Sequence, residues 1–175
     1  MKYQDVTKSP CENAYFLVFN LTLLPESRRI LIDFCNNFSG LIRSMRTRFP
    51  ELETSCVIGF GANAWTALFP NQSKPKELNT FKEIKGETYT AVSTPGDLFF
   101  HIRALKVSAC YELASIISQK LKNIVTPVDE VHGFRYFDGR SIIGFVDGTE
   151  NPEYEDERVS YAVIGDEDPE FSGGS

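Results

Sequence analysis

The sequence of 175 residues lacks a long apolar run and lacks cysteines at the spacing of metal ligands. No apolar run reaches the ~18–20 residues that a membrane-spanning helix needs. The first ten residues carry no apolar stretch behind their charges, so no signal peptide is predicted. The cysteines show no CxxC or other metal-ligand spacing. We therefore expect a cytoplasmic protein with no membrane partner and with reduced thiols, an oxidised pair of cysteines being the alternative. The cysteines are Cys11, Cys35, Cys56 and Cys110.

Positive charge is scarce, and it is unevenly distributed. The net charge is −6. Residues 129–175 hold 3 Lys and Arg against 13 Asp and Glu, a net charge of −10, whereas residues 1–128 hold 15 against 11, a net charge of +4. An acidic segment repels phosphates, and the body of the chain has no dense run of Lys and Arg. Nucleic acid is therefore not expected as a partner.

The remaining composition is ordinary for a globular domain, with 42% hydrophobic and 24% charged residues. Apolar residues at offsets of three and four predict helices over residues 26–49 and 107–122. Short apolar runs between turn residues predict strands. These strands are residues 14–21, 54–60, 97–105 and 124–137. The order strand, helix, strand, strand, helix, strand predicts an α+β, ferredoxin-like unit. We expect a four-stranded antiparallel sheet with both helices on one face and a cover on the other.

Two further elements are predicted between the second and third strands. A short helix is expected near Ala64–Leu68. Residues 69–96 contain Pro70, Pro75 and Pro95, and they predict a long connection with one short helix around residues 77–84.

The acidic end of the chain lacks clear periodicity but contains the string GFVDGTENP, residues 144–152. Gly144 and Gly148 bracket an aspartate, and glycine permits positive φ and a close approach of the backbone to a flat ligand. The same dipeptides are also ordinary turn residues. We divide the chain into a ferredoxin-like domain, residues 1–137, and a loop segment, residues 138–175.

The longer string EVHGFRYFDGRSIIGFVDGTENP resembles the dye-decolourising peroxidase family, whose members bind haem. The hallmark of that family is a GxxDG loop, here residues 144–148. The stretches HGFR, residues 132–135, and GANAW, residues 61–65, are also similar to members of the family, and the resemblance covers most of residues 12–175. It implies the first half of an α+β barrel that is built from two ferredoxin-like halves.

The resemblance implies a haem-dependent peroxidase that reduces hydrogen peroxide. Asp147 takes the distal side of haem b and moves a proton between the two oxygens of the peroxide. The loop backbone at Val146, Gly148, Thr149 and Glu150 lies against the macrocycle. The resemblance also implies an electron donor of unknown identity and association into a homo-oligomer.

One departure from the family pattern affects the iron ligand. The family's axial histidine and distal arginine lie in its second half, so we expect this chain to be the N-terminal, distal-side part of a longer protein. By itself, such a chain should bind haem weakly and show negligible turnover. His101 and His132 are interpreted as structural, with a position near the haem propionates as the alternative for His132.

A second class of function stays open at this point. Ferredoxin-like folds host many functions, and a non-enzymatic binding or assembly module would have the same pattern of elements. A calcium loop is a weaker interpretation of the acidic segment, because the D-x-D-x-D-G spacing is absent.

Overall fold

The computed structural model describes residues 3–146, 148 and 150–175. Its main elements are strands β1 (Asn13–Leu21), β2 (Ser55–Phe60), β5 (Leu98–Ala104) and β6 (Val125–Phe134), and helices α1 (Ser27–Arg48), α2 (Ala62–Leu68), α3 (Val107–Leu121) and α4 (Glu155–Ala162). A small hairpin is formed by β3 (Ile84–Lys85) and β4 (Thr90–Ala91), and three short 3₁₀ helices are η1 (Asp5–Thr7), η2 (Pro50–Leu52) and η3 (Pro169–Phe171). None of the helices in this described part is long and apolar enough to cross a membrane.

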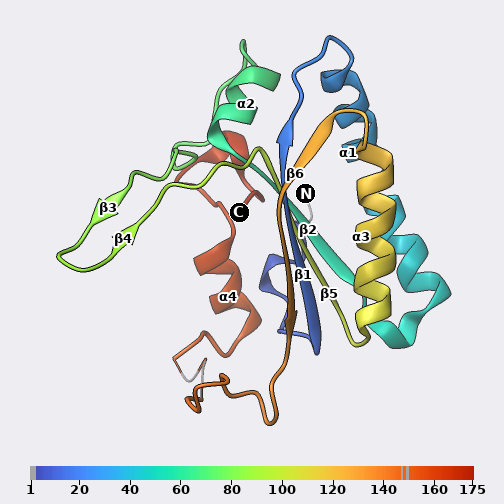
Figure 1. Cartoon of the computed structure of the whole chain (residues 1–175), viewed down its shortest axis with the longest axis vertical. Helices are drawn as coiled ribbons and strands as arrows, with labels where there is room; N and C mark the ends of the chain where they lie inside the picture. Colours follow the sequence, from blue (N-terminus) through green and yellow to red (C-terminus); the bar gives the residue numbers. More distant parts are fainter. Residues whose placement is uncertain (1–2, 147, 149) are drawn as a thin grey trace.

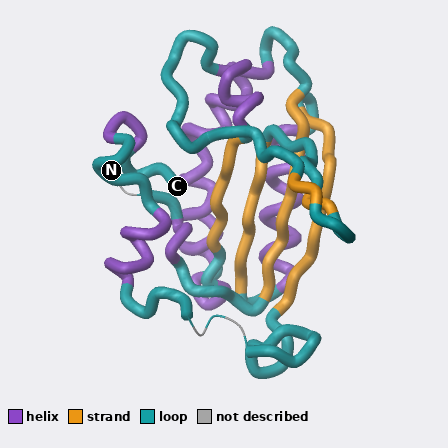
Figure 2. Tube along the Cα trace, turned by 90° about the vertical axis from the view of Figure 1, so that its left-hand side faces the viewer, coloured by secondary structure: helices purple, strands orange, loops and turns teal. Residues whose placement is uncertain are grey.

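The main sheet has the order β2-β5-β1-β6, and all three neighbouring pairs are antiparallel. Helices α1 and α3 cover one face of the sheet. Figure 1 shows the sheet edge-on, and Figure 2 looks onto its other face, with the two helices behind it. This is the ferredoxin-like α+β arrangement that the sequence predicted. The helix predicted near residues 64–68 is also present, as α2.

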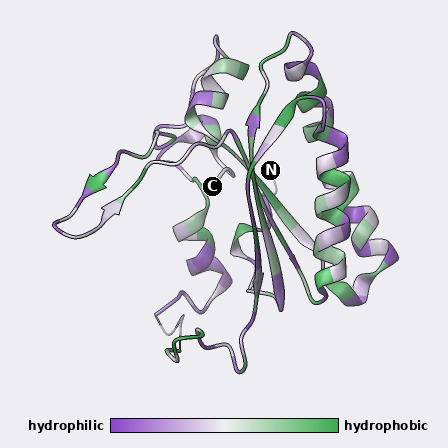
Figure 3. Cartoon of the chain, in the orientation of Figure 1, coloured by the Kyte–Doolittle hydropathy of each residue, from purple (hydrophilic) through white to green (hydrophobic). Residues whose placement is uncertain are grey.

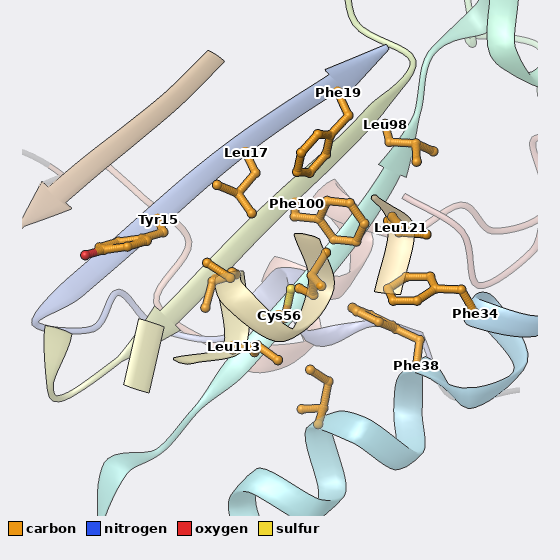
Figure 4. Packing of buried hydrophobic residues seen from close by; sticks show 14 of the residues in the cluster. Tyr15, Leu17, Phe19, Phe34, Phe38, Cys56, Leu98, Phe100, Leu113 and Leu121 are labelled. Atoms are coloured by element: carbon orange, nitrogen blue, oxygen red, sulfur yellow. The ribbon is translucent and has the colours of Figure 1, made fainter. Parts of the chain in front are cut away.

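The core lies between the sheet and the two long helices. Phe100 is fully buried at its centre. Its ring meets those of Phe19, Phe34 and Phe38 at centroid distances of 6.0, 5.9 and 6.2 Å (Figure 4). These edge-on and tilted contacts join β1 and β5 to α1, so aromatic packing fixes how that helix sits on the sheet.

The opposite face of the sheet is only partly covered by the described residues. Phe16, Phe99 and Val131 point to this face, because strand side chains alternate, and the latter two are 40% and 47% exposed. The expectation of a covered second face therefore holds for one end of the sheet only.

At that covered end, Arg103 is buried on β5 with only 6% of its surface exposed. Its guanidinium donates to the carbonyl oxygen of Lys8 at 2.8 Å and to that of Asp5. The N-terminal segment is thereby held across the sheet, since a buried guanidinium needs acceptors. The side-chain amide of Gln4 also exchanges two hydrogen bonds of 2.9 Å with the backbone of Ile58 on the edge strand β2.

One expectation for local structure was wrong, and one helix was not predicted. Residues 77–84 do not form a helix; the β3–β4 hairpin projects from the body instead (Figure 1). Phe81 and Ile84 are 52% and 62% exposed, so the segment lacks the packing against the body that stabilises most short helices. Helix α4 was missed because none of its residues is buried, which leaves no periodic signal.

Replacing Phe100 by alanine should lower the free energy of unfolding by about 3–5 kcal/mol, because it opens a cavity among three other rings. The matched control is Phe99→Ala, one position along the same strand but half-exposed, which should cost less than about 1.5 kcal/mol. Urea unfolding followed by circular dichroism measures both. Equal losses would contradict this account of the core.

Candidate functional site

The candidate site is the GxxDG loop, which follows β6 at the end of the sheet opposite α2 (Figure 1). Short backbone hydrogen bonds fold the approach to it: the Ser141 N–H donates to Phe145 O at 2.8 Å, and the Gly144 N–H donates to Ser141 O at 2.9 Å. An isolated antiparallel bridge joins Arg140 to Val146. Residues 140–146, which lead into the loop, are thus closed on themselves by their own backbone.

Gly144 and Gly148 both need to be glycine for conformational reasons. Their φ angles are +97° and +80°, in the region that other residues seldom adopt. A Cβ at Gly148 would also lie 2.9 Å from the side-chain Nδ2 of Asn151. The backbone N–H of Asn151 donates to the Gly148 carbonyl oxygen at 3.3 Å. The glycines that the sequence singled out are therefore where the backbone turns.

An ion pair lies at the base of the loop. The guanidinium of Arg140 donates to both carboxylate oxygens of Asp138, with Nε 2.7 Å from Oδ1. This hydrogen bond is the main cause that lowers the pKa of the Asp138 carboxyl below its ordinary value. Arg140 also lies 5.9 Å from the ring centroid of Phe137. Both side chains of the pair are partly exposed, so it contains no buried charge.

Large apolar side chains of the loop segment point into solvent. Ile142, Ile143, Phe145 and Val146 are 72%, 80%, 73% and 65% exposed, and Figure 3 shows hydrophobic colouring in the loop below β6. Four such residues within five positions are unusual on a free surface and mark a contact site. The geometry suits the apolar face of a flat ligand or another part of a protein.

The residues predicted for the site have different outcomes. Val146 lies in the bridge, Gly148 at the turn, and Glu150 is exposed directly after it. Asp147 and Thr149 lie outside the described residues. The assignment of a catalytic role to Asp147, and of ligand contact to its neighbours, stays a prediction.

Both histidines contact residues of the sheet. The ring of His132 stacks on Tyr15 with centroids 3.7 Å apart, and its Nε2 lies 2.6 Å from Oε1 of Glu130. His101 stacks on Phe16 at 4.5 Å, on the partly covered face. These contacts agree with the structural interpretation of both residues. In the described ranges, no three His, Cys, Asp or Glu residues are grouped so as to hold a metal ion.

The sequence did not predict the contacts that hold the chain after the loop. Oε1 of Glu155, at the start of α4, accepts hydrogen bonds of 3.0 Å from the hydroxyls of Tyr3 and Thr7. Farther on, the N–H of Lys76 donates to Asp168 Oδ2 at 2.8 Å. Two acidic residues of this segment are thus used as hydrogen-bond acceptors, and no spacing signal could have paired them with residues far away in the chain.

The comparisons with known proteins identify the family. The family model for "Dyp-type peroxidase, N-terminal" matches residues 4–135, and the model for "Dyp-type peroxidase, C-terminal" matches residues 138–175. A dye-decolorizing peroxidase of Rhodococcus erythropolis is 43% identical over 164 residues, which are 94% of this chain and 47% of the relative. One from Mycobacterium tuberculosis is 44% identical over 160 residues, 91% of this chain and 47% of the relative.

Solved structures agree with this match. The crystal structure of a dye-decolorizing peroxidase from Bacteroides thetaiotaomicron superposes with a TM-score of 0.94 at 59% identity, over 98% of this chain and 56% of that one. The encapsulated DyP-type peroxidase of Mycobacterium smegmatis gives a TM-score of 0.91 at 40% identity, over 98% and 54%. The chain belongs to the Dyp-type peroxidase family. It spans about half the length of the curated relatives it matches.

The half-buried His101 should make stability depend on pH. Burial, and then the nearby charge of Arg103, lower the pKa of its imidazole to about 4, against about 6.5 in the unfolded chain. Between these values the unfolded state binds a proton that the folded state does not, so the free energy of unfolding falls as the pH drops from 6.5 to 4. Partial solvent screening limits the loss to about 1–2 kcal/mol.

Urea unfolding at pH 7.0 and pH 4.5 measures this loss in the wild type and in His101→Gln. The variant should lose less stability than the wild type between the two pH values. His132→Gln should retain the wild-type difference, because His101 is intact there. The same pH dependence in His101→Gln and the wild type would contradict the assignment.

Proposed function

We propose that the protein containing this chain is a haem-dependent peroxidase, with this chain supplying the distal side of the haem site. The observation that carries the proposal is the GxxDG loop, turned at two glycines with positive φ and bordered by four exposed apolar side chains, in a chain of the Dyp-type family. Variants of DypB from Rhodococcus jostii, among the structural neighbours, were solved in complex with heme.

The described residues fit one face of a haem. Ile142, Phe145 and Val146 offer apolar contact to a macrocycle, and Gly148 lets the backbone approach it closely. The described residues include no candidate for the axial ligand of the iron. His101 and His132 are engaged with sheet residues, so we assign the axial ligand to neither. Haem, when bound, supplies the redox-active iron at which peroxide is reduced.

Asp147 is the residue of this chain that we assign to proton transfer. Its carboxylate would accept a proton from one oxygen of hydrogen peroxide and donate it to the other, so that the second oxygen becomes a water leaving group when the iron supplies the electrons. This role requires a carboxylate that is ionised at the working pH, and an aspartate in a model peptide has a pKa near 3.9. Val146, Gly148, Thr149 and Glu150 position this carboxylate by holding the loop against the cofactor.

The remaining partners follow from the family. The electron donor is a reducing substrate that no feature of the chain identifies. We infer a cytoplasmic protein that forms a homo-oligomer; one relative, from Mycobacterium smegmatis, is described as encapsulated. A non-enzymatic binding module is the weaker proposal, because it does not explain why the chain matches both the N-terminal and the C-terminal models of a peroxidase family.

The test uses the longest open reading frame that contains this chain. With added haemin, the purified protein should give a Soret band, and Asp147→Asn should slow its stopped-flow reaction with hydrogen peroxide by at least about tenfold. The matched control is Asp138→Asn. Asp138 lies in the same segment and pairs with Arg140, and its replacement should change the rate by less than about threefold. A protein that takes up no haemin would exclude the proposal, and an unchanged rate in Asp147→Asn would exclude the role of Asp147.

The 175-residue chain alone should bind haemin weakly and without a sharp Soret band. The reason is that neither of its histidines is available as an axial ligand. Absorbance titration of the isolated chain measures this. A strong, saturable Soret band that disappears in His101→Gln or His132→Gln would show that one of these histidines binds the iron after all.

A further inference from the structure

A second hollow lies away from the GxxDG loop, between α1, the edge strand β2 and α2. Its volume is about 290 Å³, at the small end of the ~300–1,000 Å³ typical of ligand pockets. Figures 1 and 2 place α2 and the GxxDG loop at opposite ends of the sheet, so this hollow is separate from the proposed haem site. The lining is mostly apolar; it includes Leu31, Cys35, Ile58, Phe60, Trp65 and Phe69.

The walls of the hollow favour a flat aromatic molecule. The ring of Trp65 meets that of Phe60 at 82° with centroids 6.1 Å apart, and that of Phe69 at 52° with centroids 5.0 Å apart. The indole is held in place from outside, because its Nε1–H donates to the carbonyl oxygen of Ser73 at 3.0 Å. Fixed aromatic walls at such angles present both edges and faces for ring stacking.

Arg28 is the one charged side chain among the lining residues of this hollow. Its Nε donates to the carbonyl oxygen of Leu68 at 2.8 Å, and its guanidinium carbon lies 5.7 Å from the ring centroid of Phe69. These contacts fix the orientation of the guanidinium. In the part of the chain that the structure describes, the hydrogen bond uses Nε, and the ring of Phe69 lies against the plane of the guanidinium. The two terminal nitrogens can then bind a carboxylate in the bidentate manner typical of arginine.

We propose that this hollow binds a small planar aromatic monocarboxylate of one or two fused rings. The rings of the ligand pack against the wall formed by Phe60, Trp65 and Phe69, and its carboxylate pairs with Arg28. A neutral aromatic molecule of the same size would keep the apolar contacts and lose the ion pair. A dicarboxylate would place a second charge against an apolar wall, which is unfavourable.

The experiment uses the single tryptophan of the chain. The ¹⁵N-labelled 175-residue protein is titrated with 2-naphthoate, and the indole N–H cross-peak of Trp65 is followed by NMR. We expect a saturable shift of this cross-peak. The neutral analogue 2-naphthylmethanol should bind at least about tenfold more weakly, since it lacks the charge-assisted hydrogen bonds.

Two matched variants test the role of the cation. Arg28→Gln should weaken the binding of 2-naphthoate at least about tenfold. The control, Arg29→Gln, removes the same charge from the next residue, which pairs with Asp33 at 3.7 Å. It should change the affinity for 2-naphthoate by less than about twofold. Arg28→Lys keeps the charge but not the planar fork and should fall between them. Dispersed amide signals in the same spectra check that each variant is folded.

A third variant tests the hollow itself. Cys35→Leu adds volume to a half-buried position on α1 that lines it, and should abolish the shift of Trp65. The proposal is overturned if 2-naphthoate causes no saturable shift in the wild type. It is equally overturned if Arg29→Gln weakens binding as much as Arg28→Gln does, or if Cys35→Leu leaves binding unchanged. None of these results bears on the peroxidase activity, because they measure a different site.

Discussion

The antiparallel pairing of β1 with β5 is the constraint on which the rest of the structure depends. It aligns Leu17 with Phe100 and Phe16 with His101, so alternate residues of two adjacent strands point to the same face. One face then carries Phe100 and its aromatic neighbours into the layer of α1 and α3. The other face carries Arg103, whose buried guanidinium requires carbonyl acceptors. The same register thus produces an apolar core on one side and a polar anchor on the other.

That anchor determines the course of the chain after the GxxDG loop. Arg103 holds the N-terminal segment at Lys8 and Asp5, and this segment presents Tyr3 and Thr7 to Glu155. Helix α4 therefore lies beside η1, although none of its own residues is buried. The loop is fixed at one end by β6 and at the other by α4. The segment between them is therefore attached to the body of the molecule at both ends, while its described apolar side chains stay outside the core.

Sequence patterns predicted the elements whose residues are buried periodically. Helix α1 shows buried residues at offsets of three and four, and β1 alternates buried with half-buried residues. Such patterns fail where an element has no buried face. The β3–β4 hairpin and α4 are both exposed. The hairpin depends on local propensity and its turn, and α4 is positioned by hydrogen bonds from distant residues. The string GFVDGTENP was found by its resemblance, because turn dipeptides by themselves do not distinguish a site from an ordinary turn.

The sequence by itself determined the fold class, the family and the identity of the loop, because these depend on residue order, local periodicity and a contiguous motif. Only the tertiary structure decided which residues far apart in the chain meet. Glu155 contacts Tyr3 and Thr7, and Arg28 lies over Phe69 beside Trp65. The physical reason is that these contacts join side chains on separate elements, whose relative positions are set by packing around the core rather than by spacing along the chain.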